Sequence, residues 1–172
     1  VWAVRGYAPV DGPVAFVNAS DGVGVGLAID GQLLRGAHNS AGEFGHVPLS
    51  MDGPRCACGL RGCWEAYVSV GATVARYLGS DPSWPASARP GSVTIATIVA
   101  RARQGDERAL DTLRETGVYL GRGLAMIVKA VEPARIYMSG EITEAWDLVL
   151  PSVQRAMREQ ALIREAGDCE IL

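Results

Sequence analysis

The sequence predicts an α/β or α+β domain, and three features of the chain support that prediction. Residues 13–36 contain short apolar segments separated by turn residues, as in a β-meander. Residues 106–131 contain apolar residues at the spacing of a helix with one buried face. An apolar strand, an amphipathic helix and a further strand follow from residue 134 onward. Strands and helices therefore share one chain in an order that fits α/β or α+β architecture.

The N-terminal meander is expected to have three strands. Residues 13–18 and 24–29 are the first two, with the tight loop Ser20-Asp21-Gly22 between them. Asp30-Gly31 is a strong two-residue hairpin turn, because glycine tolerates positive φ. Residues 32–35 are the returning strand.

The middle of the chain is expected to change from loop to helix. Residues 37–63 are rich in glycine, proline, cysteine and small polar residues, so they should be loop and short strand with little core of their own. Helical patterns follow at residues 64–69 and 72–78, with a break near Gly71, and again at 95–103. Residues 80–92 are rich in proline and predict a surface loop.

A long helix is expected to begin at Asp106, a good N-cap residue, and to end at Pro133. Gly117, Gly121 and Gly123 would let another element pack closely against it. Residues 134–139 then predict a buried strand, residues 146–161 an amphipathic helix, and a new strand begins at Cys169. The apolar residues on the buried face of the long helix are Leu110, Leu113, Leu120, Leu124, Ile127 and Val131.

Composition excludes several classes of protein. The 172 residues fit one domain or one lobe of a larger one, and with 48% hydrophobic and 20% charged residues a disordered chain is not expected. The net charge of -3 gives no electrostatic footprint for nucleic acid. The sequence has no signal peptide and no apolar run of about 18 residues, so we expect a soluble, cytoplasmic protein with no membrane partner. The chain opens without Met and closes on an expected strand, so we expect a fragment.

One histidine and three cysteines have the spacing of a metal site. His46 is followed by Cys56, Cys58 and Cys63, and the three cysteines fall within eight positions. Without an export signal, such a cluster favours metal over disulfides. Three thiolates and one imidazole suit tetrahedral Zn²⁺ and leave no open coordination position, which indicates a structural zinc ion. The alternative is three reduced thiols packed in a loop beside a surface histidine.

The same region resembles the ROK family of repressors, open reading frames and sugar kinases. The resemblance rests on Ala41-Gly42-Glu43-Phe44-Gly45-His46 and on the run from Cys56 to Ala66, CACGLRGCWEA. It is most specific from residue 22 to 67. It implies an actin-like ATPase (ribonuclease H-like) fold of class α/β, in which residues 1–172 are most of the C-terminal lobe, with a mixed sheet, flanking helices and a zinc-binding insertion at 42–65.

The resemblance also implies the roles of individual residues. His46, Cys56, Cys58 and Cys63 would bind structural zinc, and Glu43, His46 and Glu65 would contact hydroxyls of a bound hexose. Carboxylates are suited to this contact, because they accept charge-assisted hydrogen bonds from paired hydroxyls. From the residues alone, Glu43 and Glu65 are better explained as ordinary solvated or capping carboxylates, and the sugar contact follows only from the resemblance.

Two loops depart from the pattern of the family's kinases. In those kinases the first loop resembles Gly-Thr-Gly, whereas this chain has Ser20-Asp21-Gly22. Their second loop resembles Gly-Gly, whereas this chain has Ser139-Gly140-Glu141. The carboxylates of Asp21 and Glu141 would repel phosphate if they point inward, and would have no effect if they point to solvent. The catalytic aspartate of the kinases belongs to a part upstream of this chain, so we assign no catalytic residue here, and whether the protein is an enzyme stays open.

The sequence therefore favours the sugar-sensing, effector-binding and oligomerisation lobe of a ROK transcriptional regulator. Its ligand would be a sugar or a sugar phosphate, and the resemblance implies a homo-oligomer, either a dimer or a tetramer. DNA would be bound only by a separate N-terminal domain. The alternative is the C-terminal half of a ROK sugar kinase, which would phosphorylate a hexose with ATP. A small zinc-binding nucleic-acid module is a third possibility, and the acidic charge balance argues against it.

Overall fold

The computed structural model describes residues 12–81, 93–161 and 169–172, and its N-terminal strands form the predicted meander. These are β1 (Val14–Ala19), β2 (Val23–Ile29) and β3 (Gln32–Leu33). Asp30 and Gly31 have φ angles of 50° and 75°, as a two-residue hairpin turn requires. β3 is shorter than predicted. The amide of Leu34 still bonds the Leu27 carbonyl at 2.8 Å, but the chain then leaves the sheet and turns at Gly36.

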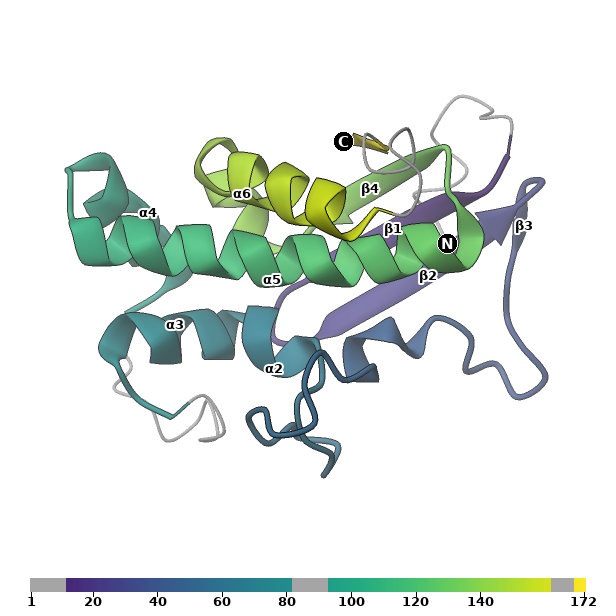
Figure 1. The fold of residues 1–172 in the computed structure, drawn as a ribbon, viewed down its shortest axis with the longest axis horizontal. Coiled ribbons are helices and arrows are strands. Elements are labelled where there is room, and N and C mark those ends of the chain that lie inside the picture. Colours follow the sequence, from purple (N-terminus) through teal and green to yellow (C-terminus); the bar gives the residue numbers. More distant parts are fainter. Residues whose placement is uncertain (1–11, 82–92, 162–168) are drawn as a thin grey trace.

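In the described part of the chain, five strands form one mixed sheet in the order β3-β2-β1-β4-β5 (Figure 1). β1 pairs antiparallel with β2 and parallel with β4 (Arg135–Ser139). β5 (Glu170–Ile171) pairs parallel with β4. This strand was predicted to begin at Cys169 and begins one residue later. Asn18 and Ser139 face each other in the register of β1 and β4. The loops that follow these two strands therefore lie at the same edge of the sheet.

One face of the sheet is covered by α5 (Glu107–Val131), which runs the length of the molecule (Figure 1). α6 (Trp146–Gln160) lies along one side of α5, and α2 (Glu65–Val68) and α3 (Val70–Leu78) lie along the other. Ala15, Val17 and Ala19, which are alternate residues of β1, point into the main core between the sheet and α5. The largest fully buried side chains of this core include Val17, Leu113, Leu120, Leu124, Ile127 and Ile136.

α5 begins and ends as its sequence predicts. The Asp106 carboxylate accepts a hydrogen bond from the Ala109 amide at 3.1 Å, and this contact lowers the pKa of the aspartate. At the other end Glu132 has a φ of 44° and Pro133 follows. Of the predicted apolar face, Leu110 and Val131 are only partly buried because they lie near the two ends of the helix.

Glycines bring α5 and α6 into close contact, as predicted. A Cβ at Gly117 would lie 2.8 Å from the Val149 carbonyl oxygen, and one at Gly121 would lie 2.4 Å from that of Val153. Both distances are too short for a side chain, so the approach of the two helices depends on glycine.

The break between the two short helices lies at Ser69, and the predicted break near Gly71 is wrong. Ser69 has extended geometry (φ -56°, ψ 156°), and its hydroxyl accepts a hydrogen bond from the Ala72 amide at 3.2 Å. Serine can thus end α2 and cap α3 without glycine, and Gly71 lies inside α3. α4 (Ile95–Arg103) has its predicted bounds. The predicted proline-rich loop at 80–92 lies almost entirely outside the described residues.

Two short 3₁₀ helices in the described part of the chain were not predicted. η1 (Glu43–His46) interrupts the expected loop at 37–63, and η3 (Glu141–Ala145) follows β4. In the rest of residues 37–63, isolated β-bridges join Pro48 to Cys63 and Arg55 to Arg61. Among the described residues, no helix is long and apolar enough to cross a membrane.

Candidate metal centre and ligand site

η1 places His46 beside the sheet because two glycines let its backbone lie directly on β2. A Cβ at Gly42 would lie 2.2 Å from the Val25 carbonyl oxygen, and one at Gly45 would lie 2.4 Å from that of Val23. Gly42 also has a φ of 96°, which glycine adopts without strain. The close contact fixes the position from which the His46 ring projects.

Cys56 and Cys58 lie on a tight knuckle that backbone hydrogen bonds hold in place. The Cys56 amide bonds the Leu60 carbonyl at 2.8 Å, and the Gly59 amide bonds the Cys56 carbonyl at 3.0 Å. Gly62 has a φ of 71°, and a Cβ there would overlap the Ser50 carbonyl. These contacts turn Cys56 and Cys58 back toward Cys63, which follows the knuckle.

The structure brings all four predicted ligands together. The ligand atoms of His46, Cys56, Cys58 and Cys63 all lie within 4.8 Å of one another. The Sγ atoms of Cys58 and Cys63 are 3.7 Å apart, and Cys56 Sγ lies 3.6 Å from His46 Nδ1. A tetrahedral zinc ion with Zn–S of about 2.3 Å and Zn–N of about 2.0 Å would separate two sulfurs by about 3.8 Å and a sulfur from a nitrogen by about 3.5 Å. The donor set and its spacing therefore fit a tetrahedral metal ion.

The thiols differ in their surroundings. Burial raises the pKa of the Cys56 thiol to about 12 and also raises the pKa of Cys63, which is fully buried. The pKa of Cys58, which is exposed, is lowered by a backbone hydrogen bond from Leu60. Because a metal ion binds thiolates, its binding would have to displace the protons of the buried pair.

The two predicted sugar-binding carboxylates flank the cluster in different ways. Glu43 is 67% exposed, and its Oε2 lies 3.9 Å from His46 Nε2. Glu65, at the start of α2, is half-buried and has hydrogen-bond partners within the protein. Its Oε2 accepts a hydrogen bond from the Val23 amide at 3.0 Å, and its Oε1 accepts one from Cys56 Sγ at 3.5 Å. Gly22 makes room for this carboxylate, because a Cβ there would lie 2.7 Å from Oε2.

Sequence reasoning did not identify Trp64, which anchors the cysteine loop to the core. Its side chain is fully buried, and its Nε1 donates to the Tyr119 carbonyl of α5 at 3.0 Å. The ring lies against Gly123, where a Cβ would sit 1.9 Å from Trp64 Cε2. Trp64 stands between Cys63 and Glu65 in the chain, so α5 fixes both neighbours. The sequence predicted that some element packs closely against Gly123, but it did not indicate that this element is the Trp64 ring.

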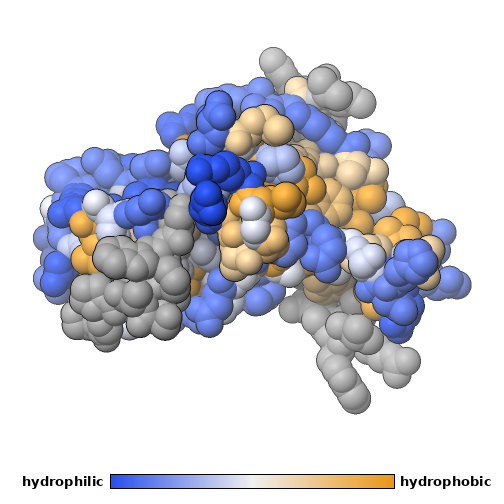
Figure 2. Space-filling view, turned by 90° about the horizontal axis from the view of Figure 1, so that it is seen from below, coloured by the Kyte–Doolittle hydropathy of each residue, from blue (hydrophilic) through white to orange (hydrophobic). Residues whose placement is uncertain are grey.

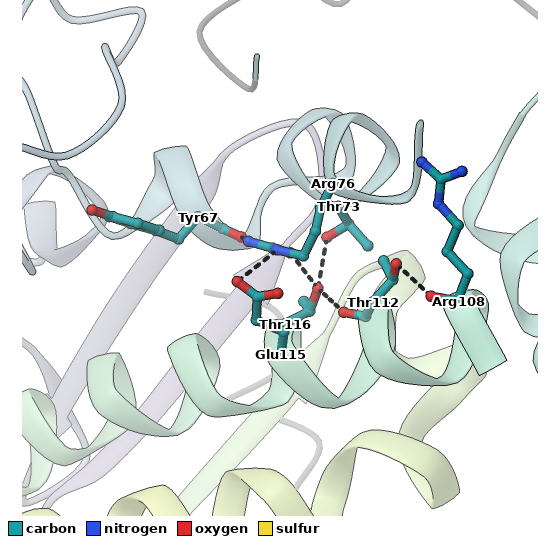
Figure 3. A network of polar contacts seen from close by, with 7 residues as sticks. All are labelled: Tyr67, Thr73, Arg76, Arg108, Thr112, Glu115 and Thr116. Atoms are coloured by element: carbon teal, nitrogen blue, oxygen red, sulfur yellow. Dashed lines mark hydrogen bonds and ion pairs between the residues drawn. The ribbon is translucent and has the colours of Figure 1, made fainter. Parts of the chain in front are cut away.

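A second anchor is a polar network between α2, α3 and α5 (Figure 3). Arg76 on α3 donates to the Tyr67 carbonyl and to the Thr116 hydroxyl, at 2.8 and 2.7 Å. Glu115 pairs with the Arg76 Nε at 3.4 Å, and Thr73 Oγ1 lies 3.4 Å from Thr116 Oγ1. Sequence reasoning did not identify this network, because its members are far apart in the chain.

The two loops that depart from the kinase pattern meet at one sheet edge. Ser139 Oγ donates to Asn18 Oδ1 at 3.1 Å across β1 and β4. Asp21 and Glu141, which follow these strands, are both exposed. Ligands of open α/β sheets bind outside the carboxyl ends of the strands, so these carboxylates lie at an edge suited to a ligand.

The mixed sheet, its flanking helices and the His-Cys cluster define the class of the protein as a lobe of the sugar-kinase-like, actin-like ATPase (ribonuclease H-like) fold. The sequence profile of the ROK family matches residues 11–172, so the chain belongs to the ROK family.

Relatives of this chain include regulators and kinases. It is 30% identical to the xylose repressor of Bacillus spizizenii, over 98% of this chain and 42% of the repressor. The crystal structure of a ROK family transcriptional regulator, a homologue of the E. coli MLC protein, matches with a TM-score of 0.78 and 31% identity, over 94% of this chain and 41% of the regulator. The ROK glucokinase from Streptomyces griseus, in complex with glucose and AMPPNP, matches with a TM-score of 0.77 and 29% identity, over 97% and 57%. The chain thus spans less than half the length of the two regulators.

Proposed function

We propose that this chain is the sugar-sensing, effector-binding and oligomerisation lobe of a ROK transcriptional regulator. The observation that carries the proposal is the pair of exposed carboxylates, Asp21 and Glu141, on adjacent loops at one edge of the sheet. A carboxylate of this pair that faces a bound phosphate at about 4 Å would oppose each unit of phosphate charge by about 4 kcal/mol, at an effective dielectric constant of about 20. This edge therefore disfavours a nucleotide polyphosphate, while a neutral sugar bound elsewhere would be unaffected. The similarity to the xylose repressor supports the same function.

The proposed cofactor is one structural zinc ion held by His46, Cys56, Cys58 and Cys63. The Cys58–Cys63 and Cys56–His46 distances are close to those of a zinc tetrahedron, and four protein ligands would leave no position for a substrate. Zinc would close the loop at 42–65, the proposed insertion in the C-terminal lobe that residues 1–172 represent. Zinc would supply no chemistry beyond this structural role, and all contacts with a ligand would come from side chains.

The proposed ligand is a sugar or sugar phosphate whose hydroxyls meet Glu43, His46 and Glu65. His46 Nδ1 faces Cys56, so a metal there would orient the ring and leave Nε2 on the side of Glu43. Glu65 contributes through the oxygen atoms that now bind Val23 and Cys56, so ligand binding and the order of this loop would be linked. Binding would shift the population of conformations in a dimer or tetramer, whose DNA contacts come from a separate N-terminal domain.

The alternative function is the C-terminal half of a ROK sugar kinase. The match to the glucokinase structure favours it, since that enzyme was crystallised with glucose and a nucleotide analogue. In that case this chain would act only with an upstream part that supplies the catalytic aspartate, while Asp21 and Glu141 would point away from the nucleotide.

Isothermal titration of the full-length protein with a hexose panel (glucose, N-acetylglucosamine, mannose, xylose) and with ATP–Mg²⁺ separates the two functions. We expect a hexose to bind and ATP to give no signal, with zinc quantified on the same sample at one per chain. The double variant Asp21→Thr, Glu141→Gly tests the cause, because it should gain nucleotide affinity if the two carboxylates exclude phosphate. ATP-dependent phosphorylation of a hexose by the unmodified protein would overturn the proposal.

A further inference from the structure

The carbonyl of Tyr67 depends on a side chain for its hydrogen bond. α2 has only four residues, and Ser69 turns the chain before α3 begins. The last carbonyls of a helix lack partners within the helix. Arg76 Nη2 on the next helix donates to the Tyr67 carbonyl at 2.8 Å.

Arg76 is itself held from several directions. Its side chain is 16% exposed, and its guanidinium contacts the Thr116 hydroxyl, the Glu115 carboxylate and the face of the Tyr119 ring, which lies 5.3 Å away. Figure 3 shows the guanidinium between the Tyr67 carbonyl and α5. The planar guanidinium can donate in several directions at once, which a lysine ammonium on its flexible stem cannot reproduce in the same geometry.

α2 begins beside two residues of the proposed site. Glu65 is its first residue, and Cys63 precedes it by two positions. Trp64 fixes the start of this helix on α5. Its end is held by Arg76, by the stacking of the Tyr67 ring on Tyr119, and by the bond from the Val70 amide to the Ser20 carbonyl. A change at Arg76 would let α2 tilt about Trp64, which would displace both the Cys63 thiolate and the Glu65 carboxylate.

We propose that Arg76 is a positioning residue for the metal and sugar site, acting through the Tyr67 carbonyl on Cys63 and Glu65. This inference rests on the proposed function, because it assumes that these side chains bind metal and sugar. Groups outside the ligand shell that orient metal ligands typically contribute 10–100-fold to metal affinity. Arg76→Met should therefore weaken zinc binding by at least about 10-fold.

The test compares Arg76→Met and Arg76→Lys with two controls in the full-length protein. Leu113→Val trims a fully buried residue of α5 outside the network, so it matches a general loss of stability. Glu115→Gln removes the ion pair of Arg76 but leaves its contact with Tyr67. Zinc affinity is measured by competition with a chromogenic chelator well below the melting temperature, and amide hydrogen exchange is followed at residues 63–69.

We expect both Arg76 variants to weaken zinc binding and to speed exchange in α2, with both controls close to wild type. Equal zinc affinity in Arg76→Met and Leu113→Val, or unchanged exchange in α2, would overturn the inference. If the wild-type protein binds no zinc, the proposed metal site fails, and the exchange measurement still decides whether Arg76 holds α2.

Discussion

His46 turns its two ring nitrogens toward different groups. Nδ1 lies 3.6 Å from Cys56 Sγ, on the side of the thiols, and Nε2 lies 3.9 Å from the Glu43 carboxylate. A metal bound at Nδ1 would fix the ring, and the other nitrogen would then take part in an outer contact. Of the two flanking carboxylates, Glu43 is the exposed one, whereas Glu65 already has two internal partners. Glu43 is therefore the residue at which ligand contact can be separated from folding.

Glu43→Gln should weaken sugar binding by at least about 10-fold, because a hydrogen bond to a charged group contributes about 1.5–3 kcal/mol. The variant should leave the melting temperature and the zinc content unchanged, since the Glu43 side chain is mostly exposed. Isothermal titration with the hexose found for the wild type measures the effect. Glu107→Gln, an exposed acidic residue at the start of α5, is the matched control. Wild-type affinity in Glu43→Gln would remove this residue from the sugar site.

At the scale of elements, α5 is the helix to which both the sheet and the cysteine loop attach. Glycines on it serve two neighbours: Gly117 and Gly121 admit α6, and Gly123 admits Trp64. Trp64 bonds the Tyr119 carbonyl as well as packing on the glycine, so its indole satisfies both its apolar and its polar requirements.

Gly123→Ala should destabilise the protein by about 1–3 kcal/mol or more, because the new methyl would overlap a fully buried ring. Alanine favours a helix by about 1 kcal/mol over glycine, which offsets only part of that cost. Gly24→Ala is the control, since a Cβ there meets nothing within 4 Å. Urea unfolding followed by circular dichroism measures both. A wild-type midpoint for Gly123→Ala would show that Trp64 can shift without cost, and the anchoring role of this contact would then be rejected.

Local patterns predicted the elements well, and contacts between distant residues were not predictable in the same way. The bounds of α4 and the start of α5 follow from apolar periodicity and from the Asp106 cap. The cluster of candidate metal ligands follows from spacing, because His46, Cys56, Cys58 and Cys63 lie on one loop. The break between α2 and α3 was predicted near Gly71 rather than at Ser69, because glycine is among the strongest signals for the interruption of a helix. A serine whose hydroxyl caps the next helix can interrupt it as well. The bond between Glu65 and Val23 joins residues 42 positions apart, and no local pattern encodes it.

At the scale of the whole molecule, the core and the cysteine loop are stabilised by different means. The main core lies between the sheet and α5, with α6 packed beside it. The loop buries few side chains. Met51 is 79% exposed and Leu60 58%, and the cluster around Cys56, Cys63 and Ala66 is small and separate. Figure 2, which looks from the side of the loop in Figure 1, shows hydrophobic surface beside strongly hydrophilic residues.

Removal of the metal should therefore loosen the loop without unfolding the core. The free energy of metal binding would order residues 46–63, which have too little apolar burial to order themselves, whereas the sheet and α5 have their own core. After chelation we expect amide hydrogen exchange to rise mainly in this segment, and protection in α5 to stay near its original level. Cys63→Ala should behave like the chelated protein, and Cys169→Ala, which lies outside the cluster, should behave like the untreated one. Exchange that rises equally in the loop and in α5 would mean that the metal supports the fold as a whole, and the separation of the two stabilising regions would be wrong.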